Sequence, residues 1–553
     1  MHLQTFLAAS LQQATPDRKI VIRTGLFGNL IGSIENAATS DEKAIAIALE
    51  WPDLDPRLGF RQTGGWSREQ LNDILLEVRR SLDRLKAALA LLPPAIPVGL
   101  SLPTLPFAPV FASPGWMCSP AESALQAALA EFSGAVLTTP NVSIVNRGWL
   151  DEKSQPAQRF DLKSDLLTGL PYSLAHADTM GQALAQLLSP QSPKKGLITD
   201  LDNTFWKGIV GDDGPDGVSW DLSGRSQIHG LYQQMLRALA DEGVLIGIAS
   251  KNDPEAVKQA FARPDVLMPL DRAFPAEIHW NAKSGSVDRI LRTWNVLADS
   301  VVFVDDSPME LAEVQAAHPG LECILFPQAD YAEAYALLRH LRDRFGKARV
   351  SDEDRLRLQS IRQNAEFQQG MGQGAPPDTF LEQLNATVTL DFRLSTADPR
   401  VLELVNKTNQ FNLNGIRYSE ADWQAALQRP GAFLITVNYE DKFGQLGKIA
   451  VLQGTERGHT LQVDAWVMSC RAFARRIEHC CLQTLFQHFD ARQIHFALQP
   501  TAKNGPVVSF LTGLIAAEPS SRKVTLSRKR FTAQCPELYH TLKSITADQA
   551  HHG

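Results

Sequence analysis

Short apolar runs alternate with amphipathic helical patterns between about residues 194 and 346. One apolar run ends at Asp200, and two others cover 244–249 and 301–304. Continuous apolar runs of this length are typical of strands that are buried on both faces of a parallel sheet. The helical patterns between them supply the crossover connections that such a sheet needs. This middle part of the chain is therefore predicted to form a Rossmann-like parallel sheet.

The first 190 residues show a related pattern. Strands are expected at 19–23, 95–100 and 135–138, and helices at 67–91 and 119–133. Alternation of strands and helices favours an α/β layer fold. A segment rich in serine and proline, 189–193, marks a hinge before the middle part.

The last part of the chain, 378–549, has a different pattern. The expected strands are 385–392, 433–439, 447–453 and 460–468, and the expected helices are 398–406, 419–427 and 471–488. This arrangement favours an α+β fold with an antiparallel centre. The whole chain is therefore predicted to be an α/β protein of three domains, 1–190, 194–346 and 378–549.

Composition excludes some classes of protein. The 553 residues are 44% hydrophobic and 21% charged, with a net charge of −7, which is typical of soluble globular domains and indicates neither a nucleic-acid nor a membrane partner. The amino terminus is too polar for a secretory signal. The six cysteines show no disulfide or zinc spacing, so free thiols in the cytoplasm are expected.

The segment KGLITDLDNTFWK carries the first candidate chemistry. Asp200, Asp202 and Thr204 follow one another at steps of two where the strand ends, so their side chains are expected to point the same way. Two carboxylates and a hydroxyl together can hold a hard divalent cation and offer an oxygen nucleophile to phosphorus. The alternative is that these residues only form turns or cap a helix.

Three further pieces follow in the sequence. Ser250 ends the second apolar run, Lys283 precedes a helical pattern, and Asp305 and Asp306 end the third run. A hydroxyl and an ammonium can bind phosphoryl oxygens, and an aspartate can complete a metal site at the carboxyl ends of parallel strands. Taken singly, Ser250 can instead be a helix cap and Lys283 a solvated lysine.

A cysteine is the candidate nucleophile of the last part. Ser469, Cys470 and Arg471 are expected to open the helix 471–488, and Arg475 adds positive charge. A helix amino terminus and nearby arginines favour the reactive thiolate. The alternative is that Cys470 is a small buried residue, as most free cysteines are.

Amide-rich segments lie on both sides of this cysteine. NKTNQFN contains Asn406 and Asn409, and PTAKNGP contains Asn504. Their side chains can bind a polar ligand, or they can cap helix ends.

In this order, the four pieces of the middle part resemble the haloacid dehalogenase superfamily of phosphotransferases. The resemblance implies that Asp200 is the nucleophile and Asp202 the general acid and base. The residues that it implies for phosphate binding are Thr204, Ser250, Lys251, Asn252 and Lys283. The residues that it implies for holding Mg²⁺ are Asp200, Asp202, Asp305 and Asp306.

Several longer segments resemble the FkbH-like branch of that superfamily, which belongs to polyketide biosynthesis. They are DLDNTFWKGIVGDDG, SKND, WNAK, FVDDSPMEL, NKTNQFN, DKFGQLG and MSCRAFARRIE, and they extend over roughly 194–515. The family resemblance implies a degenerate SGNH-hydrolase-like first domain without esterase chemistry and a GNAT-like last domain. Two departures are Ala474, where the family usually has glycine, and Phe205, where leucine is commoner.

The resemblance also implies an activity. A glyceryl unit from 1,3-bisphosphoglycerate, or a related acyl phosphate, is loaded onto a phosphopantetheinylated acyl carrier protein, and phosphate is lost. Cys470 would carry the acyl group transiently, and Asn406, Asn409, Arg471, Arg475 and Asn504 would bind the acyl group or the carrier. Two alternatives stay open: a Mg²⁺-dependent phosphatase of a small metabolite with inert flanking domains, and a non-enzymatic scaffold.

Overall fold

A computed structural model gives the structure of the chain. It describes residues 2–16, 18–26, 28–63, 67–108, 113–328, 330–347, 350, 357–359, 361–362, 378–394, 398–408, 411–442, 444–469, 472–473, 475–501, 504–515 and 524–546. The chain divides into two compact units, Met1–Ser192 and Pro193–Gly553. No helix in the described part of the chain is both long enough and apolar enough to cross a membrane. The division into three domains stays a prediction.

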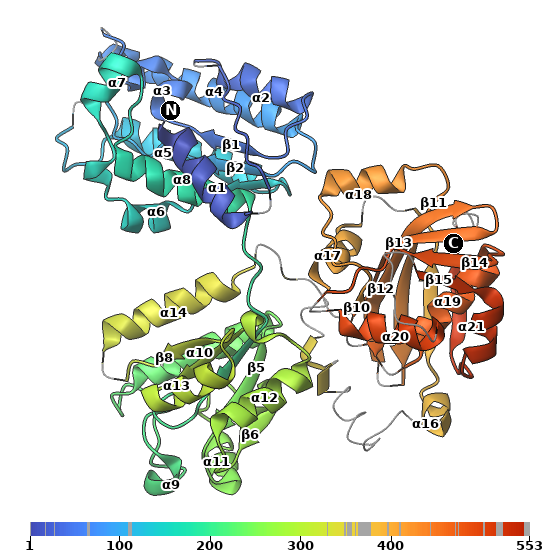
Figure 1. Cartoon of the computed structure of the whole chain (residues 1–553). Helices are drawn as coiled ribbons and strands as arrows, with labels where there is room; N and C mark the ends of the chain where they lie inside the picture. Colours follow the sequence, from blue (N-terminus) through green and yellow to red (C-terminus); the bar gives the residue numbers. More distant parts are fainter. Residues whose placement is uncertain are drawn as a thin grey trace. The chain divides into compact units, whose positions relative to one another are not determined.

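The first unit is built on a three-stranded parallel sheet in the order β1 (Ile45–Ala48), β2 (Val98–Ser101), β3 (Val142–Ile144). The helices α4 (Leu71–Ala90) and α5 (Pro120–Val136) cover one face, and α8 (Leu174–Leu188) covers the other, with α1 (His2–Ala14) packed along α8 (Figure 1). Other elements of this unit are α2 (Leu30–Ala38), α3 (Trp51–Leu54), α6 (Arg147–Lys153) and α7 (Leu162–Thr168), with 3-10 turns at Pro56–Leu58, Arg68–Gln70 and Pro156–Gln158.

Two strands predicted for this unit are wrong. The segment 19–23 has no sheet partner and its Val21 is exposed, whereas the short run Ile45–Ala48 forms β1 with its Ile47 in the core. The segment 135–138 lies at the end of α5, because Val136 continues the apolar face of that helix, and the strand begins only at Val142. The helix predicted at 67–91 and the strand predicted at 95–100 are confirmed as α4 and β2.

The second unit contains a five-stranded sheet in the order β6 (Ala276–Ile278), β5 (Leu245–Ser250), β4 (Gly196–Thr199), β7 (Val301–Asp305), β8 (Glu322–Leu325), with every pair parallel. The helices α10 (Gln227–Asp241), α11 (Pro254–Phe261) and α14 (Tyr331–Phe345) cover one face. The helices α12 (Lys283–Trp294) and α13 (Pro308–Ala317) cover the other. A helix layer on each face makes this a doubly wound α/β fold, which confirms the predicted parallel sheet.

Glycines in two neighbouring strands determine where α12 packs. A Cβ on Gly196 would lie 2.5 Å from the Trp294 ring, and a Cβ on Gly247 would lie 2.9 Å from the same ring. The strands therefore make room for this indole, whose Nε1 donates a hydrogen bond of 2.6 Å to the carbonyl of Phe274. Since Lys283 is the first residue of α12, this packing also positions the lysine at the carboxyl edge of the sheet.

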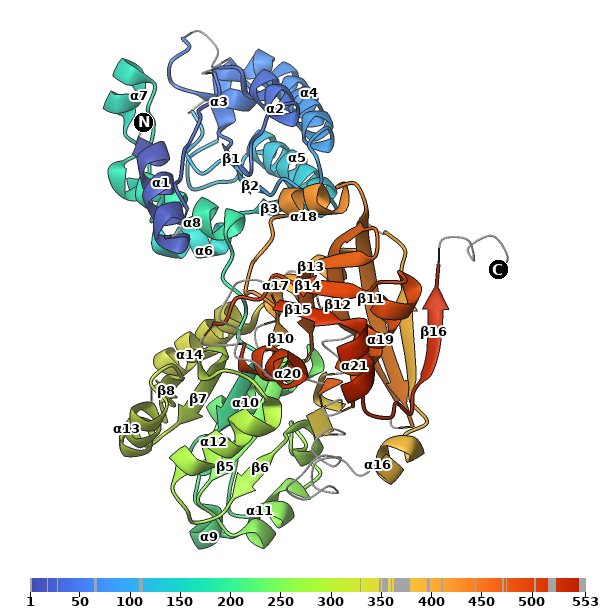
Figure 2. The same ribbon diagram turned by 45° about the vertical axis from the view of Figure 1, so that its right-hand side comes forward.

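The second unit also contains an eight-stranded mixed sheet. Its order is β15 (Val524–Ser527), β14 (Gln493–Phe496), β13 (Thr460–Met468), β12 (Gly444–Arg457), β11 (Ala432–Asp441), β9 (Thr387–Asp391), β16 (Thr541–Ile545), with β10 (Phe411–Asn412) paired to β13. β16 forms one edge (Figure 2). The strands β9 to β13 along this path pair antiparallel, as predicted.

The helices α17 (Pro399–Lys407) and α18 (Glu420–Leu427) pack on one face of this sheet, and α19 (Ile477–His488) and α20 (Gly505–Ile515) pack on the other. Two further helices are α16 (Asp378–Gln383) and α21 (Arg528–Gln534).

The helix predicted at 471–488 begins later than expected. α19 starts at Ile477, because Arg476 before it has a φ of +57°, which lies outside the right-handed helical region. The expectation that the segment around Cys470 forms the amino terminus of this helix is therefore wrong. Cys480 and Cys481 lie deeper in α19 and are buried core residues.

Candidate active site

The carboxyl ends of the central strands bring the predicted residues together. Asp200 follows β4 directly, Ser250 is the last residue of β5, and Asp305 is the last residue of β7. β4 lies between β5 and β7, so the three residues share one edge of the parallel sheet. This edge is where open parallel sheets bind their ligands.

Lys283 joins the acidic residues of this edge. Its Nζ lies 2.9 Å from Asp200 Oδ1 and 2.6 Å from Asp305 Oδ2, and it also contacts Glu310 Oε2. The side chain of Lys283 is only 3% exposed. One buried ammonium therefore faces three carboxylates, which leaves an excess of negative charge at the site.

Burial strongly affects the pKa values of these carboxyl groups. Burial raises the pKa of Asp200 to about 6, although the Lys283 ammonium opposes the shift. Burial and the Asp200 charge raise the pKa of Asp305 to about 7. Burial would also raise the pKa of Glu310, but contacts with Lys283 and Lys251 outweigh it and lower the pKa. Desolvation thus dominates at the two aspartates on the sheet.

This carboxylate cluster fits a divalent cation. Single oxygens of Asp200, Asp305 and Glu310 all lie within 4.8 Å of one another. Hard divalent cations such as Mg²⁺ prefer carboxylate oxygens, and a second positive charge would offset the excess negative charge. The cluster differs from the predicted metal ligands, because it includes Glu310 and contains neither Asp202 nor Asp306.

Glu310 is not among the metal ligands predicted from the sequence. This residue lies in the first turn of α13, five positions after Asp305, in the segment FVDDSPMEL. Ser307 caps the helix by accepting a hydrogen bond from the Glu310 backbone N–H, so the helix starts immediately after the two aspartates. The sequence signal for Glu310 is the Ser-Pro pair directly after the two aspartates. Such a pair begins a helix and therefore places the next acidic residue in the first helical turn.

Asp202 is held beside the cluster by three donors. Its Oδ1 accepts hydrogen bonds from Trp206 Nε1 at 2.8 Å and from the Val210 backbone N–H at 3.1 Å. Its Oδ2 accepts one from Asn252 Nδ2 at 2.8 Å. These bonds fix the orientation of the carboxylate, and they tie it to the short insert after β4 that contains α9 (Val210–Asp213).

Asp306 and Thr204 interact with each other. Thr204 Oγ1 donates a hydrogen bond of 3.3 Å to Asp306 Oδ1, and Gln328 Nε2 donates to the other oxygen of Asp306. The His229 Nδ1 lies 3.0 Å from the Thr204 carbonyl, to which it donates. Asp306 therefore holds the loop after β4, where Thr204 lies, against the end of β7.

The remaining predicted phosphate-binding residues lie around the same edge. Ser250 is 3% exposed, Asn252 is 1% exposed, and Lys251 Nζ lies 3.0 Å from Glu310 Oε1. Lys251 therefore adds a second positive charge on the outer side of Glu310. Binding of phosphate by these residues stays a prediction.

The structure describes some of the candidate residues of the last part of the chain and not others. Cys470, Arg471 and Asn409 lie outside the described residues. Asn406 exchanges two hydrogen bonds of 2.8 Å with the backbone of Tyr418. Asn504 donates to the carbonyls of Asn412 and Gln499, and buried Arg475 lies 3.6 Å from Asp441. These contacts hold loops in position. The binding roles of the five predicted residues, Asn406, Asn409, Arg471, Arg475 and Asn504, stay predictions.

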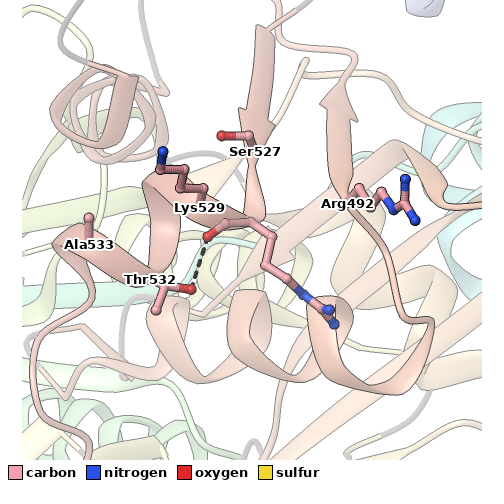
Figure 3. Close-up of a pocket in the computed structure, with 6 residues that line it drawn as sticks. Arg492, Ser527, Lys529, Thr532 and Ala533 are labelled. Atoms are coloured by element: carbon pink, nitrogen blue, oxygen red, sulfur yellow. Dashed lines mark hydrogen bonds between the residues drawn. The ribbon is translucent and has the colours of Figure 1, made fainter.

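A cavity of about 620 Å³ lies beside the edge of the eight-stranded sheet (Figure 3). It is lined by Arg492, Ser527, Arg528, Lys529, Thr532 and Ala533. The side chains of Arg492 and Lys529 point in different directions (Figure 3). None of the described residues that line this cavity is acidic.

Comparison with known proteins gives limited similarities. No protein-family model matches the sequence, and no curated protein matches it. The N-terminal part of protein BF1531 from Bacteroides fragilis, a solved structure described as containing a phosphatase domain complexed with Mg, is similar with a TM-score of 0.41 and 21% identity. That match covers 58% of this chain and 99% of the other. An uncharacterised protein from Corynebacterium glutamicum matches with a TM-score of 0.20 and 18% identity, over 28% of this chain and 98% of the other. At these values neither similarity carries an argument about function.

Proposed function

We propose that the chain is a Mg²⁺-dependent phosphatase of the haloacid dehalogenase type that works in loading a glyceryl unit onto an acyl carrier protein. The observation that carries the phosphatase part is the convergence of Asp200, Asp305 and Lys283 at one edge of a parallel sheet, with Asp202 fixed beside them. The loading part rests on the resemblance of the sequence to the FkbH-like family.

The residues of the site divide the phosphate chemistry among themselves. An oxygen of Asp200 attacks phosphorus, and the bond from phosphorus to the leaving oxygen breaks. Asp202 gives its proton to that leaving oxygen and then takes a proton from the water that cleaves the aspartyl phosphate. Lys283 offsets charge between the nucleophile and the phosphoryl oxygens. The three hydrogen bonds to Asp202 keep its carboxyl group in place for both proton transfers.

The acidic cluster is where the metal would bind. Asp200, Asp305 and Glu310 would hold Mg²⁺, which supplies charge neutralisation that lets an anionic nucleophile approach a phosphoryl group. Lys283 contacts the same three carboxylates, so it limits the negative charge of the cluster before the cation binds.

The acyl chemistry would take place at the MSCR segment, residues 468–471, which begins at the last residue of β13. The Cys470 thiolate attacks the carbonyl carbon of the acyl phosphate, a sulfur–carbon bond forms, and phosphate leaves with the bond electrons. The thiol of the carrier's phosphopantetheine then attacks the thioester, and Cys470 leaves as a thiolate. The remaining phosphate of the donor is removed at the Asp200 site.

A second candidate function is a Mg²⁺-dependent phosphatase of a small metabolite. The observation that favours it is that the described carboxylates of the site, Asp200, Asp305 and Glu310, all come from the five-stranded sheet and a helix packed on it. In that case phosphate release needs no carrier protein and does not respond to Cys470→Ser.

The test is incubation with 1,3-bisphosphoglycerate, Mg²⁺ and a phosphopantetheinylated carrier protein, followed by intact mass of both proteins. We expect glyceryl, without phosphate, on the carrier for the wild type and no acylated carrier for Cys470→Ser. Cys480→Ser, which changes a buried core cysteine of α19, is the matched control. Phosphate release without any acylation would favour the second candidate, and neither reaction would contradict both.

A further inference from the structure

Two buried polar groups near the start of α19 lack hydrogen-bond partners. They are Nε1 of Trp466 and Nδ1 of His479, and neither atom has a partner among the described residues. A buried polar group without a partner costs about 1–3 kcal/mol, so a native protein seldom keeps one without a reason. Two such groups in one region indicate a place where another molecule completes the hydrogen bonds.

The two groups share one aromatic surrounding. The Trp466 ring lies edge-on to Phe510 of α20 with 5.9 Å between ring centroids, and the His479 ring lies edge-on to the same phenyl at 5.0 Å. Phe411 of β10 lies 5.2 Å from the Trp466 ring and 6.1 Å from Phe510. Both polar atoms therefore belong to rings that pack against apolar aromatic side chains.

This region lies where β13 no longer pairs with β14. β13 pairs with β14 only over Thr460–Val463, and β10 pairs with its last two residues, Val467 and Met468. Trp466 lies in this second half of β13, and His479 is in the first turn of α19. The segment 469–476, which contains the MSCR cysteine, connects these two elements.

The two polar atoms indicate the chemistry of a ligand. An indole N–H can only donate, so it requires an acceptor oxygen. Burial, assisted by the Arg476 charge, lowers the pKa of His479 to about 4, so its imidazole is neutral at pH 7 and each ring nitrogen can pair with a hydroxyl. A short acyl chain with two oxygens besides its carbonyl, at least one of them a hydroxyl, meets both requirements, whereas a plain alkyl chain meets neither.

Building on the proposed function, we propose that Trp466 and His479 bind the hydroxylated acyl unit during transfer and select it over an acyl chain of equal length without hydroxyls. The indole N–H donates to an oxygen of the acyl chain other than its carbonyl, and Nδ1 of His479 pairs with a hydroxyl of that chain. A site that hydrogen-bonds a substrate hydroxyl discriminates strongly against an analogue that lacks it, because the buried groups are then left unpaired.

The test compares two small acyl donors with the full-length chain. Glyceryl-N-acetylcysteamine and propionyl-N-acetylcysteamine thioesters are each incubated with the enzyme and the phosphopantetheinylated carrier protein. The Cys470 thiolate attacks the thioester carbonyl, and N-acetylcysteamine leaves as a thiolate. The carrier thiol then takes the acyl group from Cys470, and its proton goes to the released N-acetylcysteamine. Intact mass of the carrier over time gives the two rates. Neither donor carries a phosphate that has to be removed, so the reaction does not require the Asp200 site.

We expect the wild type to transfer glyceryl at least about 10-fold faster than propionyl. Trp466→Phe and His479→Gln should lose most of this preference because glyceryl transfer slows while propionyl transfer is unchanged. The matched controls are Trp423→Phe, a buried tryptophan on the other face of the sheet, and His488→Gln at the end of the same helix. Both controls should keep the wild-type preference.

The outcomes separate this inference from the proposed function. Equal rates for both donors with the wild type, or an unchanged preference in both variants, would overturn the inference and leave carrier loading intact. A carrier that stays unmodified with both thioesters and with 1,3-bisphosphoglycerate would overturn both. If phosphate were still released from 1,3-bisphosphoglycerate in that case, only the phosphatase part of the proposed function would stand.

Discussion

Lys283 decides the charge balance of the candidate active site. It is buried, and its ammonium is shared by Asp200, Asp305 and Glu310. Breaking a buried ion pair by removing one partner leaves uncompensated charge in a poorly solvated place. The residue therefore serves stability as well as the proposed phosphate chemistry.

Replacing Lys283 with methionine should destabilise the second unit by about 3 kcal/mol in the absence of divalent cations. Mg²⁺ should recover part of this loss, because a ligand that binds only the folded cluster stabilises it by mass action. Urea denaturation with and without Mg²⁺ measures both effects. Lys251→Met is the control. That side chain is 31% exposed and, among the described residues, its ion pair is with Glu310 alone, so the loss should stay below about 1 kcal/mol. Equal losses in the two variants would contradict the charge argument.

At this scale, the residues that follow apolar runs were predictable from the sequence, whereas Glu310 was not. Asp200, Ser250 and Asp305 each end an apolar run, and parallel strands bring such ends together whatever the details of packing. Glu310 depends on the start of α13, which the Ser307 cap fixes in space. The direction of the Asp202 carboxylate depends on Trp206, Val210 and Asn252, and spacing along a strand cannot give these partners.

At the scale of elements, an ion cluster joins the edge strand β8 to the helix α14. Glu322 on β8 contacts Lys194 at 3.1 Å and His340 at 2.8 Å, and it also pairs with Arg344. Burial alone would raise the pKa of Glu322, but hydrogen bonds from Arg344, His340 and Lys194 outweigh it and lower the pKa to about 2.

The lowered pKa of Glu322 predicts a pH-dependent contribution to stability. A carboxyl group whose pKa falls from 4.5 to about 2 on folding stabilises the folded state fully above pH 4.5, and this stabilisation is lost as the pH falls toward 2. Glu322→Gln should therefore cost about 1–2 kcal/mol at pH 7, and its difference from the wild type should shrink between pH 4.5 and pH 2. Denaturation curves at pH 7, 5, 4 and 3 measure this. Glu255→Gln, an exposed carboxylate of α11, should show no such trend, and a constant difference for Glu322→Gln would contradict the assignment.

The elements that sequence reasoning placed correctly are those with a long, uniform burial pattern. The strands β5, β7 and β13 carry continuous or regular apolar runs whose period is visible without knowledge of partners. The wrong predictions, at 19–23 and 135–138, fall on short apolar segments, and tertiary packing decides whether such a segment becomes a strand. The late start of α19 follows from one backbone angle at Arg476, which residue type does not reveal.

At the scale of the whole molecule, the two proposed chemistries belong to different sheets. The carboxylate cluster lies at the edge of the five-stranded sheet, and the MSCR segment follows β13 of the eight-stranded sheet. Their hydrophobic clusters share no residues. A substitution at one site should therefore leave the chemistry of the other site intact.

Asp200→Asn and Cys470→Ser should separate the two reactions. Asparagine keeps the size of Asp200 but cannot attack phosphorus, so this variant should form a carrier adduct that is heavier than the wild-type product by one phosphoryl group. Cys470→Ser should form no acylated carrier, yet it should still release phosphate from a small ester such as p-nitrophenyl phosphate. Intact mass and a phosphate assay measure these outcomes. An adduct without phosphate from Asp200→Asn would contradict the role of the aspartate.

Mixing the two variants gives the sharper form of this test. If phosphate is removed from the carrier-bound acyl group, then the heavier adduct made by Asp200→Asn is a substrate for the intact carboxylate site of Cys470→Ser. The mixture should then yield the wild-type product, although neither variant does so alone. Asp216→Asn, an exposed aspartate in the insert after β4, should form that product by itself. A mixture that accumulates only the heavier adduct would contradict this order of transfer before dephosphorylation. Phosphate would then be lost before the acyl group leaves the enzyme.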